Sequence, residues 1–248
     1  MQIKRLPRSV TRELRYYVYL YIDPEDGEVF YVGKGKGNRA LSHADGTGDE
    51  KHAEFIRNLR RKGLRPEVEI LIHGLATEEA AHAVEAAVID LIGVENLTNE
   101  SRGHGSSKRG RMTLEQVLAL YQRKRAKITE PTILIRINEL YRYGMTDMEL
   151  YDATRGVWVV GERREKAELA MADYEGIVRE VYEINHWLPG GSTFSTRDPR
   201  GVQHKGRWEF VGTLAPKATR QKYLHRAVDK YLTRGSRNPI TYVNCNCD

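Results

Sequence analysis

The N-terminal part of the chain opens with two short runs of β-forming residues. Residues 16–22 (YYVYLYI) and 29–33 (VFYVG) flank a polar turn that contains Asp26 and Gly27. Aromatic and β-branched residues favour strands, and an Asp-Gly turn between two such runs favours a hairpin. The pattern therefore predicts a β-hairpin.

Helical patterns and one further strand follow the hairpin. Residues 38–44 and 52–62 predict two helices, and 68–74, after Pro66, predict a strand. Thr77 is a suitable N-cap for a helix that runs to about Ile92, where Gly93 can end it. The first unit is predicted to be α+β, with strands and helices in the order ββαβα.

The second half of the chain has a different pattern, in which strand-like and helical segments are mixed. Two helices are expected at 113–126 and 146–156, and two more at 165–174 and 219–235. Strand candidates are residues 156–161, 176–187, 207–215 and 238–245. This mixture predicts a small α+β domain that resembles a barrel.

The two patterns are separated by a basic segment. Between residues 102 and 127 there are eight basic residues and one acidic residue, Glu115. We therefore expect a mixed-sheet domain flanked by helices at 1–112, a basic helical connector at 113–149, and the second α+β domain at 150–248.

Composition narrows the class of protein. The 248 residues include 40 Lys and Arg against 34 Asp and Glu, so the net charge is +6, which is compatible with a polyanionic partner. The two cysteines, Cys245 and Cys247, exclude a disulfide framework. The most apolar stretch, residues 80–93, is too short to span a membrane and contains Glu85 and Asp90. A cytoplasmic protein without a membrane partner is expected.

Candidate chemistry is concentrated in the first unit. Arg39 and His43 lie one helical turn apart, and the Arg39 guanidinium suits bidentate phosphate contact. Gly33, together with Lys34 and Lys36, lies in a run expected to let the backbone approach a phosphate.

Glu85 is the candidate metal ligand. It lies among alanines in a helix expected to be half-buried, where a carboxylate is costly unless something binds it. A hard divalent cation, Mg²⁺ or Mn²⁺, is the partner that fits an oxygen donor.

The first unit resembles the GIY-YIG nuclease family over about residues 15–111. Tyr17-Val18-Tyr19 stands where the family has its first tripeptide, and Tyr31-Val32-Gly33 stands for the second. Tyr17 replaces the first glycine. The run at 33–39 (GKGKGNR) is similar to the branch with the ankyrin- and LEM-domain nucleases of animals.

The resemblance implies catalytic roles for the polar residues that occur in the same order as in the family. Tyr19, or alternatively Tyr31, would act as general base on water, with its pKa lowered by Arg39, Lys34 or a metal ion. Asn99 would orient the metal-binding carboxylate or the backbone. The implied catalytic residues are Tyr19, Tyr31, Arg39, His43, Glu85 and Asn99.

The second half resembles the PUA-like superfamily, which includes readers of modified bases. Aromatic side chains can stack on a base that has been extruded from a duplex. Candidates for such a base pocket are Trp158, Tyr182, Trp187, Phe194 and Trp208. Residues 190–201 are expected to form a mobile loop in which Arg197 and Arg200 contact backbone phosphates.

Together these features predict a metal-dependent DNA endonuclease of the restriction type, and recognition of a modified base stays open. Double-stranded DNA is the expected substrate. One active site per chain means that cutting both strands needs two protomers or two visits, so a homodimer is an open possibility. The alternatives are a non-catalytic nucleic-acid binding module and a structure-specific nuclease of repair or recombination.

Overall fold

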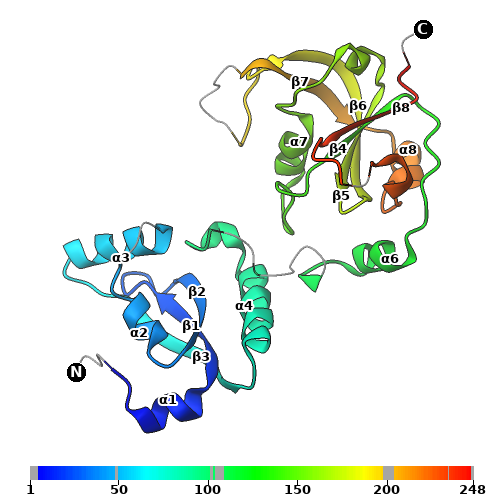
Figure 1. Ribbon diagram of the computed structural model, residues 1–248. Coiled ribbons are helices and arrows are strands. Elements are labelled where there is room, and N and C mark those ends of the chain that lie inside the picture. The colour runs from blue at the N-terminus through cyan, green and yellow to red at the C-terminus, as the bar shows by residue number, and fades with distance from the viewer. Residues whose placement is uncertain are drawn as a thin grey trace. The chain divides into compact units, whose positions relative to one another are not determined.

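The chain folds as two compact units, Met1–Arg111 and Met112–Asp248 (Figure 1). The computed structural model describes residues 5–47, 50–100, 103, 109–197, 204–233 and 235–246. In these ranges no helix combines the length and the apolar content needed to cross a bilayer.

The first unit is built on an antiparallel sheet with the strand order β2-β1-β3. Its strands are β1 (Tyr16–Ile22), β2 (Val29–Lys36) and β3 (Glu67–Leu75). Its helices are α1 (Arg8–Leu14), α2 (Arg39–His43), α3 (Lys51–Arg61), α4 (Glu78–Ile92) and the 3-10 turn η1 (Val94–Asn96). The predicted hairpin, the third strand and the helices that follow are all present.

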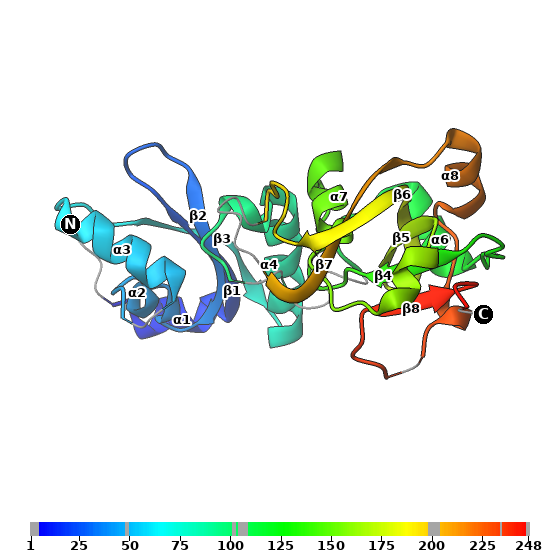
Figure 2. The ribbon, with the colours of Figure 1, turned by 90° about the horizontal axis from the view of Figure 1, so that it is seen from above.

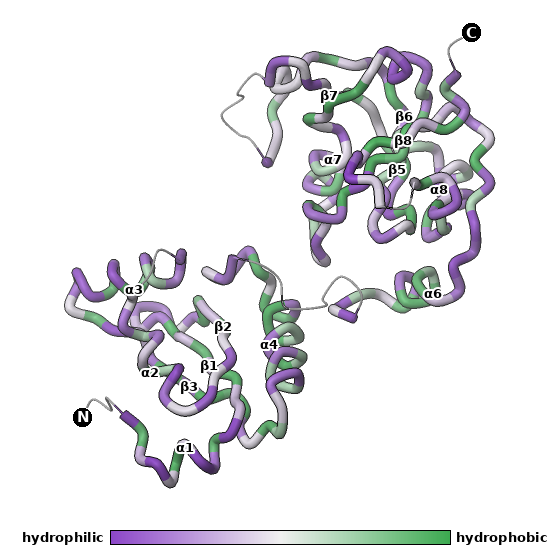
Figure 3. The backbone as a smooth tube through the Cα atoms, in the orientation of Figure 1, coloured by the Kyte–Doolittle hydropathy of each residue, from purple (hydrophilic) through white to green (hydrophobic). Residues whose placement is uncertain are grey.

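Helices cover both faces of this sheet. Alternate residues of a strand point to opposite faces. Tyr17, Tyr19 and Tyr21 of β1 therefore pack against α2 and α3, whereas Val18 and Leu20 pack with Ile89 of α4. Figures 1 and 2 both place α2 and α3 on one side of the sheet and α4 on the other. Helix α4 carries hydrophobic and hydrophilic residues in turn along its length (Figure 3), as expected for a helix with one covered face.

The second unit contains a five-stranded sheet with the order β7-β6-β5-β4-β8. Strands β4 and β5 are parallel, and the other neighbours are antiparallel. The strands are β4 (Thr132–Arg136), β5 (Leu169–Tyr174), β6 (Ile177–Gly190), β7 (His204–Leu214) and β8 (Ile240–Val243). The helices are α6 (Leu114–Gln122), α7 (Asp147–Arg155) and α8 (Lys217–Tyr223), with 3-10 turns η2 (Glu162–Lys166) and η3 (Asp229–Tyr231).

Three predicted elements of this unit were wrong. Residues 165–174 are not a helix, because they contain the end of η2 and the whole of β5, in which all six side chains are buried. A strand covered on both faces is a continuous apolar run without alternation, which periodicity does not separate from a helix. The helix predicted at 219–235 ends at Tyr223. The strand predicted at 156–161 is reduced to one bridge, between Trp158 and Trp208.

The barrel and the connector also differ from expectation. Strands β7 and β8 end the sheet on opposite sides, so the described strands form an open sheet and no closed barrel. Strand β4, which lies inside the expected connector at 113–149, pairs with β5 and β8 in this sheet. Its buried run Thr132–Arg136 supplies core to the second unit, so this segment is part of that unit.

Candidate active site

Glycines of β2 make room for tyrosines of β1. Tyr17 lies opposite Gly35, and Tyr19 lies opposite Gly33. A Cβ at position 33 would stand 2.7 Å from the Tyr19 hydroxyl oxygen, so a larger residue there would displace the phenol. The run predicted as a phosphate-binding loop is therefore mostly strand, and Gly33 is buried beneath a side chain of its own sheet.

The phenols of β1 hold the segment that carries Arg39 and His43. Tyr17 donates a hydrogen bond to the Gly37 carbonyl and accepts one from the Ala40 N–H, both at 3.1 Å. Tyr21 donates to the Ala40 carbonyl at 2.7 Å. The start of α2 is thus fixed against the sheet by side chains about 20 residues away in sequence.

Tyr19 and His43 form the central pair of the site. The Tyr19 hydroxyl lies 3.2 Å from His43 Nδ1, and the direction of this hydrogen bond depends on the histidine tautomer. The order of the motif residues predicted that both belong to the site. In the structure, the packing of α2 against β1 brings their side chains together.

A second histidine extends this pair. His52 of α3 stacks on Tyr31 and lies against His43, with ring centroids 4.5 Å apart in both contacts. It is 4% exposed, and its Nε2 has no hydrogen-bond partner in the described part of the chain. Sequence reasoning missed His52 because a histidine at the start of a basic helix carries no distinctive spacing signal.

Glu85 and Asn99 are both tied to the backbone of β2. The Lys34 N–H donates to Glu85 Oε1 at 2.9 Å, and Glu85 Oε2 lies 3.6 Å from His82 Nδ1. Asn99 accepts from the Val32 N–H at 3.0 Å and donates to the Val32 carbonyl at 2.8 Å. The sequence predicted that Asn99 orients either the metal-binding carboxylate or the backbone. In the structure Asn99 contacts the backbone of Val32.

Arg39 stands exposed at the start of α2. In the ranges that the structure describes, its guanidinium makes no hydrogen bond or ion pair, yet its charge acts on Tyr31, His43 and Glu85. A cation that is close to these groups and not engaged by a carboxylate is available for a phosphate.

The pKa values in the site differ from the expectation for a tyrosine base. Burial raises the pKa of Tyr19 well above its ordinary value, and the charge of Arg39 only partly offsets this. Burial and the nearby charges of His52 and Arg39 lower the pKa of His43. The prediction that a cation lowers the tyrosine pKa was therefore wrong for the protein alone. At neutral pH the Tyr19 phenol and the His43 imidazole are therefore both uncharged.

Burial also affects the carboxylate. It raises the pKa of Glu85, whereas the Lys34 N–H and nearby cations pull in the opposite direction. The Glu85 side chain is 17% exposed, and its Oε2 accepts no hydrogen bond among the described contacts. Mg²⁺ keeps several waters and often takes only one or two carboxylates together with substrate phosphates. A single partly buried carboxylate suits such an ion, and no group of three His, Cys, Asp or Glu ligands is found in the described ranges.

The two predicted phosphate-binding lysines have different environments. Lys34 forms an ion pair with Glu78, whereas the Lys36 ammonium lies 4.8 Å from the ring centroid of Tyr16. Lys36 also lines a hollow of about 490 Å³ together with Arg8 and Arg12 of α1. Sequence reasoning missed these two arginines, although the basic N-terminal segment was a signal for them.

The five aromatic candidates of the second unit do not line one pocket. Tyr182 and Trp187 are 2% and 8% exposed and belong to the core, where the Trp187 indole N–H donates to the Arg164 carbonyl at 3.0 Å. The Arg164 guanidinium lies 3.6 Å from the ring centroid of Trp208. A cavity of about 630 Å³ beside Trp187 includes none of the other four candidates in its lining.

The remaining aromatics and the loop arginines have other environments. Trp158 packs partly buried against the core, and Phe194 is 71% exposed. Arg197 donates to the Gly156 carbonyl at 2.7 Å, so part of its guanidinium serves the protein itself. Arg200 and Cys247 lie outside the described residues.

The comparison with known families bears on this site in the first unit. Residues 27–121 match the family model of the LEM-3-like GIY-YIG domain. This match supports the GIY-YIG nuclease family for the first unit, and it includes Arg39, His43 and Glu85 but begins after Tyr19. No curated protein and no solved structure matches the chain.

This match supports the general part of the predicted activity. The domain supports a nuclease, nuclease domains act on nucleic acid, and GIY-YIG nucleases generally depend on a divalent metal. The predicted resemblance of the first unit is confirmed over the matched residues. The PUA-like resemblance of the second unit has no such support.

Proposed function

We propose that the chain is a metal-dependent DNA endonuclease that hydrolyses phosphodiester bonds in its first unit. The observation that carries this proposal is the 3.2 Å contact between Tyr19 and His43, beside the Arg39 guanidinium, which has no partner among the described residues. An activated proton acceptor and a free guanidinium are the two elements that the hydrolysis needs from the protein.

Tyr19 and His43 act as a proton relay. As the water oxygen attacks phosphorus, its proton passes to the Tyr19 oxygen while the Tyr19 proton passes to His43 Nδ1. The raised pKa of Tyr19 and the lowered pKa of His43 suit this order, because no free phenolate is needed. We place Tyr19 rather than Tyr31 in this role, because in the described contacts Tyr31 has no hydrogen bond to a histidine.

Arg39 and Glu85 act on the phosphate. The Arg39 guanidinium can hold two phosphate oxygens in its planar fork, and this contact strengthens as charge develops there. A divalent cation held by Glu85, Mg²⁺ or Mn²⁺, would supply further neutralisation of that charge. Asn99 and the Lys34 N–H keep Glu85 and β2 in place for this task.

Basic surfaces support a double-stranded DNA substrate. Arg8, Arg12 and Lys36 share one hollow, and Gly37, which lies two residues before Arg39, also lines it. Contacts of this kind to a phosphate backbone give affinity without sequence preference. We assign recognition of the DNA target to the second unit. The proposed role is that of a restriction-type nuclease, and its target is either an unmodified sequence or a sequence with a modified base.

A homodimer is the simplest way to cut both strands, because each first unit offers one site. Strand β3 is an edge strand whose Ile70, Leu71 and Ile72 are 37%, 46% and 37% exposed. Unpaired edges with apolar side chains are places where a second strand can add. This feature supports a second copy of the chain as the partner.

The decisive experiment is cleavage of plasmid DNA with and without Mg²⁺, using unmodified, 5-methylcytosine and 5-hydroxymethylcytosine DNA. We expect cutting with Mg²⁺ and none with EDTA. Glu85→Gln should reduce the rate by roughly 100-fold or more, because charge stabilisation of several kcal/mol is lost. Glu79→Gln, an exposed carboxylate on the same helix, is the matched control.

Three outcomes would count against the proposal. Full activity in EDTA, or equal cutting by Glu85→Gln, would remove metal dependence. DNA binding by the wild-type protein without cutting in any metal would favour the non-catalytic binding module. Cutting of branched DNA in preference to linear DNA would favour the repair or recombination nuclease.

A further inference from the structure

Two aromatic side chains of the second unit are largely exposed, Tyr121 of α6, which is 76% exposed, and Phe194 of the loop between β6 and β7. Phe194 is 71% exposed, whereas the other three phenylalanines of the chain are buried or half-buried. Leaving a large apolar ring in water forgoes the free energy of burial. An exposed ring indicates a binding surface when the backbone that carries it is held in place.

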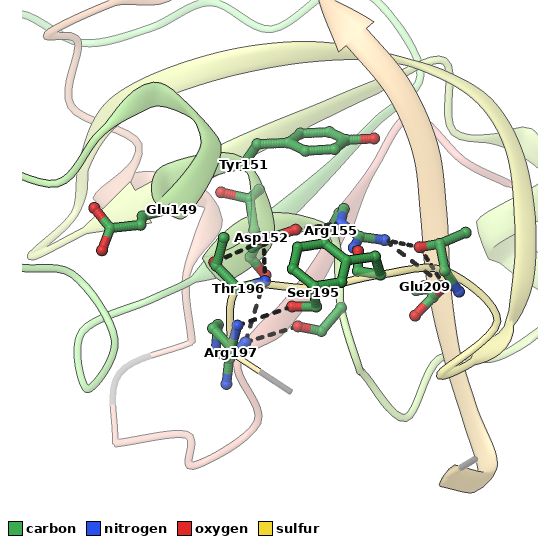
Figure 4. A network of polar contacts seen from close by, with 12 residues as sticks. Glu149, Tyr151, Asp152, Arg155, Ser195, Thr196, Arg197 and Glu209 are labelled. Carbon is green, nitrogen blue, oxygen red and sulfur yellow. Dashed lines mark hydrogen bonds and ion pairs between the residues drawn. The ribbon is translucent and has the colours of Figure 1, made fainter. Parts of the chain in front are cut away.

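Two buried carboxylates, Asp152 and Glu209, both labelled in Figure 4, hold the loop that carries Phe194. Glu209 of β7 accepts from the Thr193 N–H and hydroxyl, both at 2.8 Å, and from the Gly191 N–H at 2.9 Å. Asp152 of α7 accepts from the Thr196 N–H and hydroxyl, both at 2.7 Å. The residues at positions one before and two after Phe194 are therefore both fixed.

A buried arginine holds Phe194 itself. Arg155 donates from Nε to Asp152 at 2.6 Å, and its other nitrogens donate to the Thr193 hydroxyl and to the carbonyl oxygen of Phe194. Asp152, Arg155 and Glu209 are 2%, 4% and 3% exposed. We call these three residues the loop clamp.

The Asp152 carboxyl of the loop clamp is ionised at neutral pH. Burial would raise the pKa of Asp152, but hydrogen bonds from Thr196 and Arg155 outweigh it, and the pKa is lowered. Buried ion pairs are costly to desolvate and are often no more stabilising than apolar residues. The distinctive result of this clamp is a fixed backbone at Phe194. The mobile loop expected from the sequence is, at residues 191–197, an anchored one.

The chemistry around the loop suits a polyanion with flat apolar surfaces. Strands β6 and β7 pair Gly190 with His204, so the loop leaves and returns at neighbouring positions. Residues 191–207 include four basic residues and one acidic residue. Basic residues attract phosphates, and an exposed ring stacks on any nucleobase because every base has an apolar face.

We propose that Phe194 is a nucleobase-stacking anchor, presented by the loop clamp to the DNA that the second unit recognises. The inference rests on the proposed function, because it takes DNA as the ligand. It differs from the base pocket expected from the sequence, since Phe194 projects from the protein and the other four aromatics pack within it. Pre-organisation by the clamp lowers the ordering cost that a free loop would add to binding.

The experiment compares variants of the full chain for binding to a fluorescent DNA duplex in buffer without divalent metal. Phe194→Ala should weaken binding by about 5- to 100-fold, the range expected for loss of one base stack. Phe194→Trp should keep most of the affinity. Val159→Ala is the matched control, because Val159 is an exposed apolar residue of the same unit, 67% exposed, and should bind as the wild type does.

A second measurement reports stacking directly. A 2-aminopurine base in the duplex should change its fluorescence on binding of the wild type and of Phe194→Trp, and much less with Phe194→Ala. Wild-type affinity for Phe194→Ala, with an unchanged 2-aminopurine signal, would overturn the anchor and leave the nuclease intact. Loss of self-association in Phe194→Ala, with unchanged DNA affinity, would also overturn it. A wild-type protein that neither binds nor cuts DNA would mean that the proposed function has failed.

Discussion

The candidate active site of the first unit and the loop clamp of the second unit treat their polar groups in opposite ways. In the first unit, His52 Nε2 and the Arg39 guanidinium have no partner in the described contacts, although both lie near Tyr31. In the second unit, Asp152, Arg155 and Glu209 satisfy one another and the loop. A buried histidine with a lowered pKa and no partner among the described contacts is available to act on a substrate. Groups that are fully paired fix geometry instead.

This contrast explains why the sites differ in form. In the first unit the sheet positions a relay by hydrogen bonds from phenols and leaves the reactive ends open. In the second unit the charged groups point inward, and an apolar ring is what reaches the solvent.

The largest expected effect tests the relay in the first unit. Tyr19→Phe removes the hydroxyl that contacts His43, so single-turnover cleavage should fall by about 10²- to 10⁴-fold, the usual value of general acid–base catalysis. DNA affinity should change little. Tyr16→Phe, on the same strand, is the control. Normal cutting by Tyr19→Phe together with loss in Tyr31→Phe would reverse the assignment of the two tyrosines.

The next effect tests the loop clamp in the second unit. Arg155→Leu leaves the carboxylates of Asp152 and Glu209 buried without their cation, which should cost about 3–5 kcal/mol in the free energy of unfolding. Lys205→Ala, which is exposed, should cost little. Chemical denaturation followed by the tryptophans, all three of which lie in the second unit, measures this change. A decrease of less than about 1 kcal/mol in the free energy of unfolding would show that the buried ion pairs of the loop clamp contribute little to the stability of the fold.

The smallest effect is on the pH dependence of cleavage. His43 accepts a proton only when it is neutral, and its pKa is lowered from the ordinary value of 6.5. The rate should therefore persist below pH 6.5 and fall only as the pH drops through the lowered pKa. The raised pKa of Tyr19 predicts no loss from phenol ionisation near neutral pH. A rate–pH profile of the wild type, with His43→Asn as reference, checks this, and a midpoint above 6.5 would contradict it.

Local sequence determined much of the first unit. The Asp-Gly turn, the β-forming runs and the Thr77 cap predicted the hairpin and α4, and the Thr77 side chain does accept from the Ala80 N–H. The order of Tyr19, Arg39, His43 and Glu85 was enough to indicate phosphodiester chemistry. The turn and the cap are short-range features, because they involve residues that are close along the chain.

The tertiary structure alone decided how the parts meet. Lys34 binds Glu85 across 51 residues, and Arg155 binds Phe194 across 39. The sequence did not indicate that Gly33 lies beneath Tyr19, that residues 169–174 form a strand, or that Phe194 is held outward. The physical reason is that burial, pKa values and hydrogen-bond partners depend on neighbours that only long-range packing brings together, and these neighbours leave no mark in local periodicity.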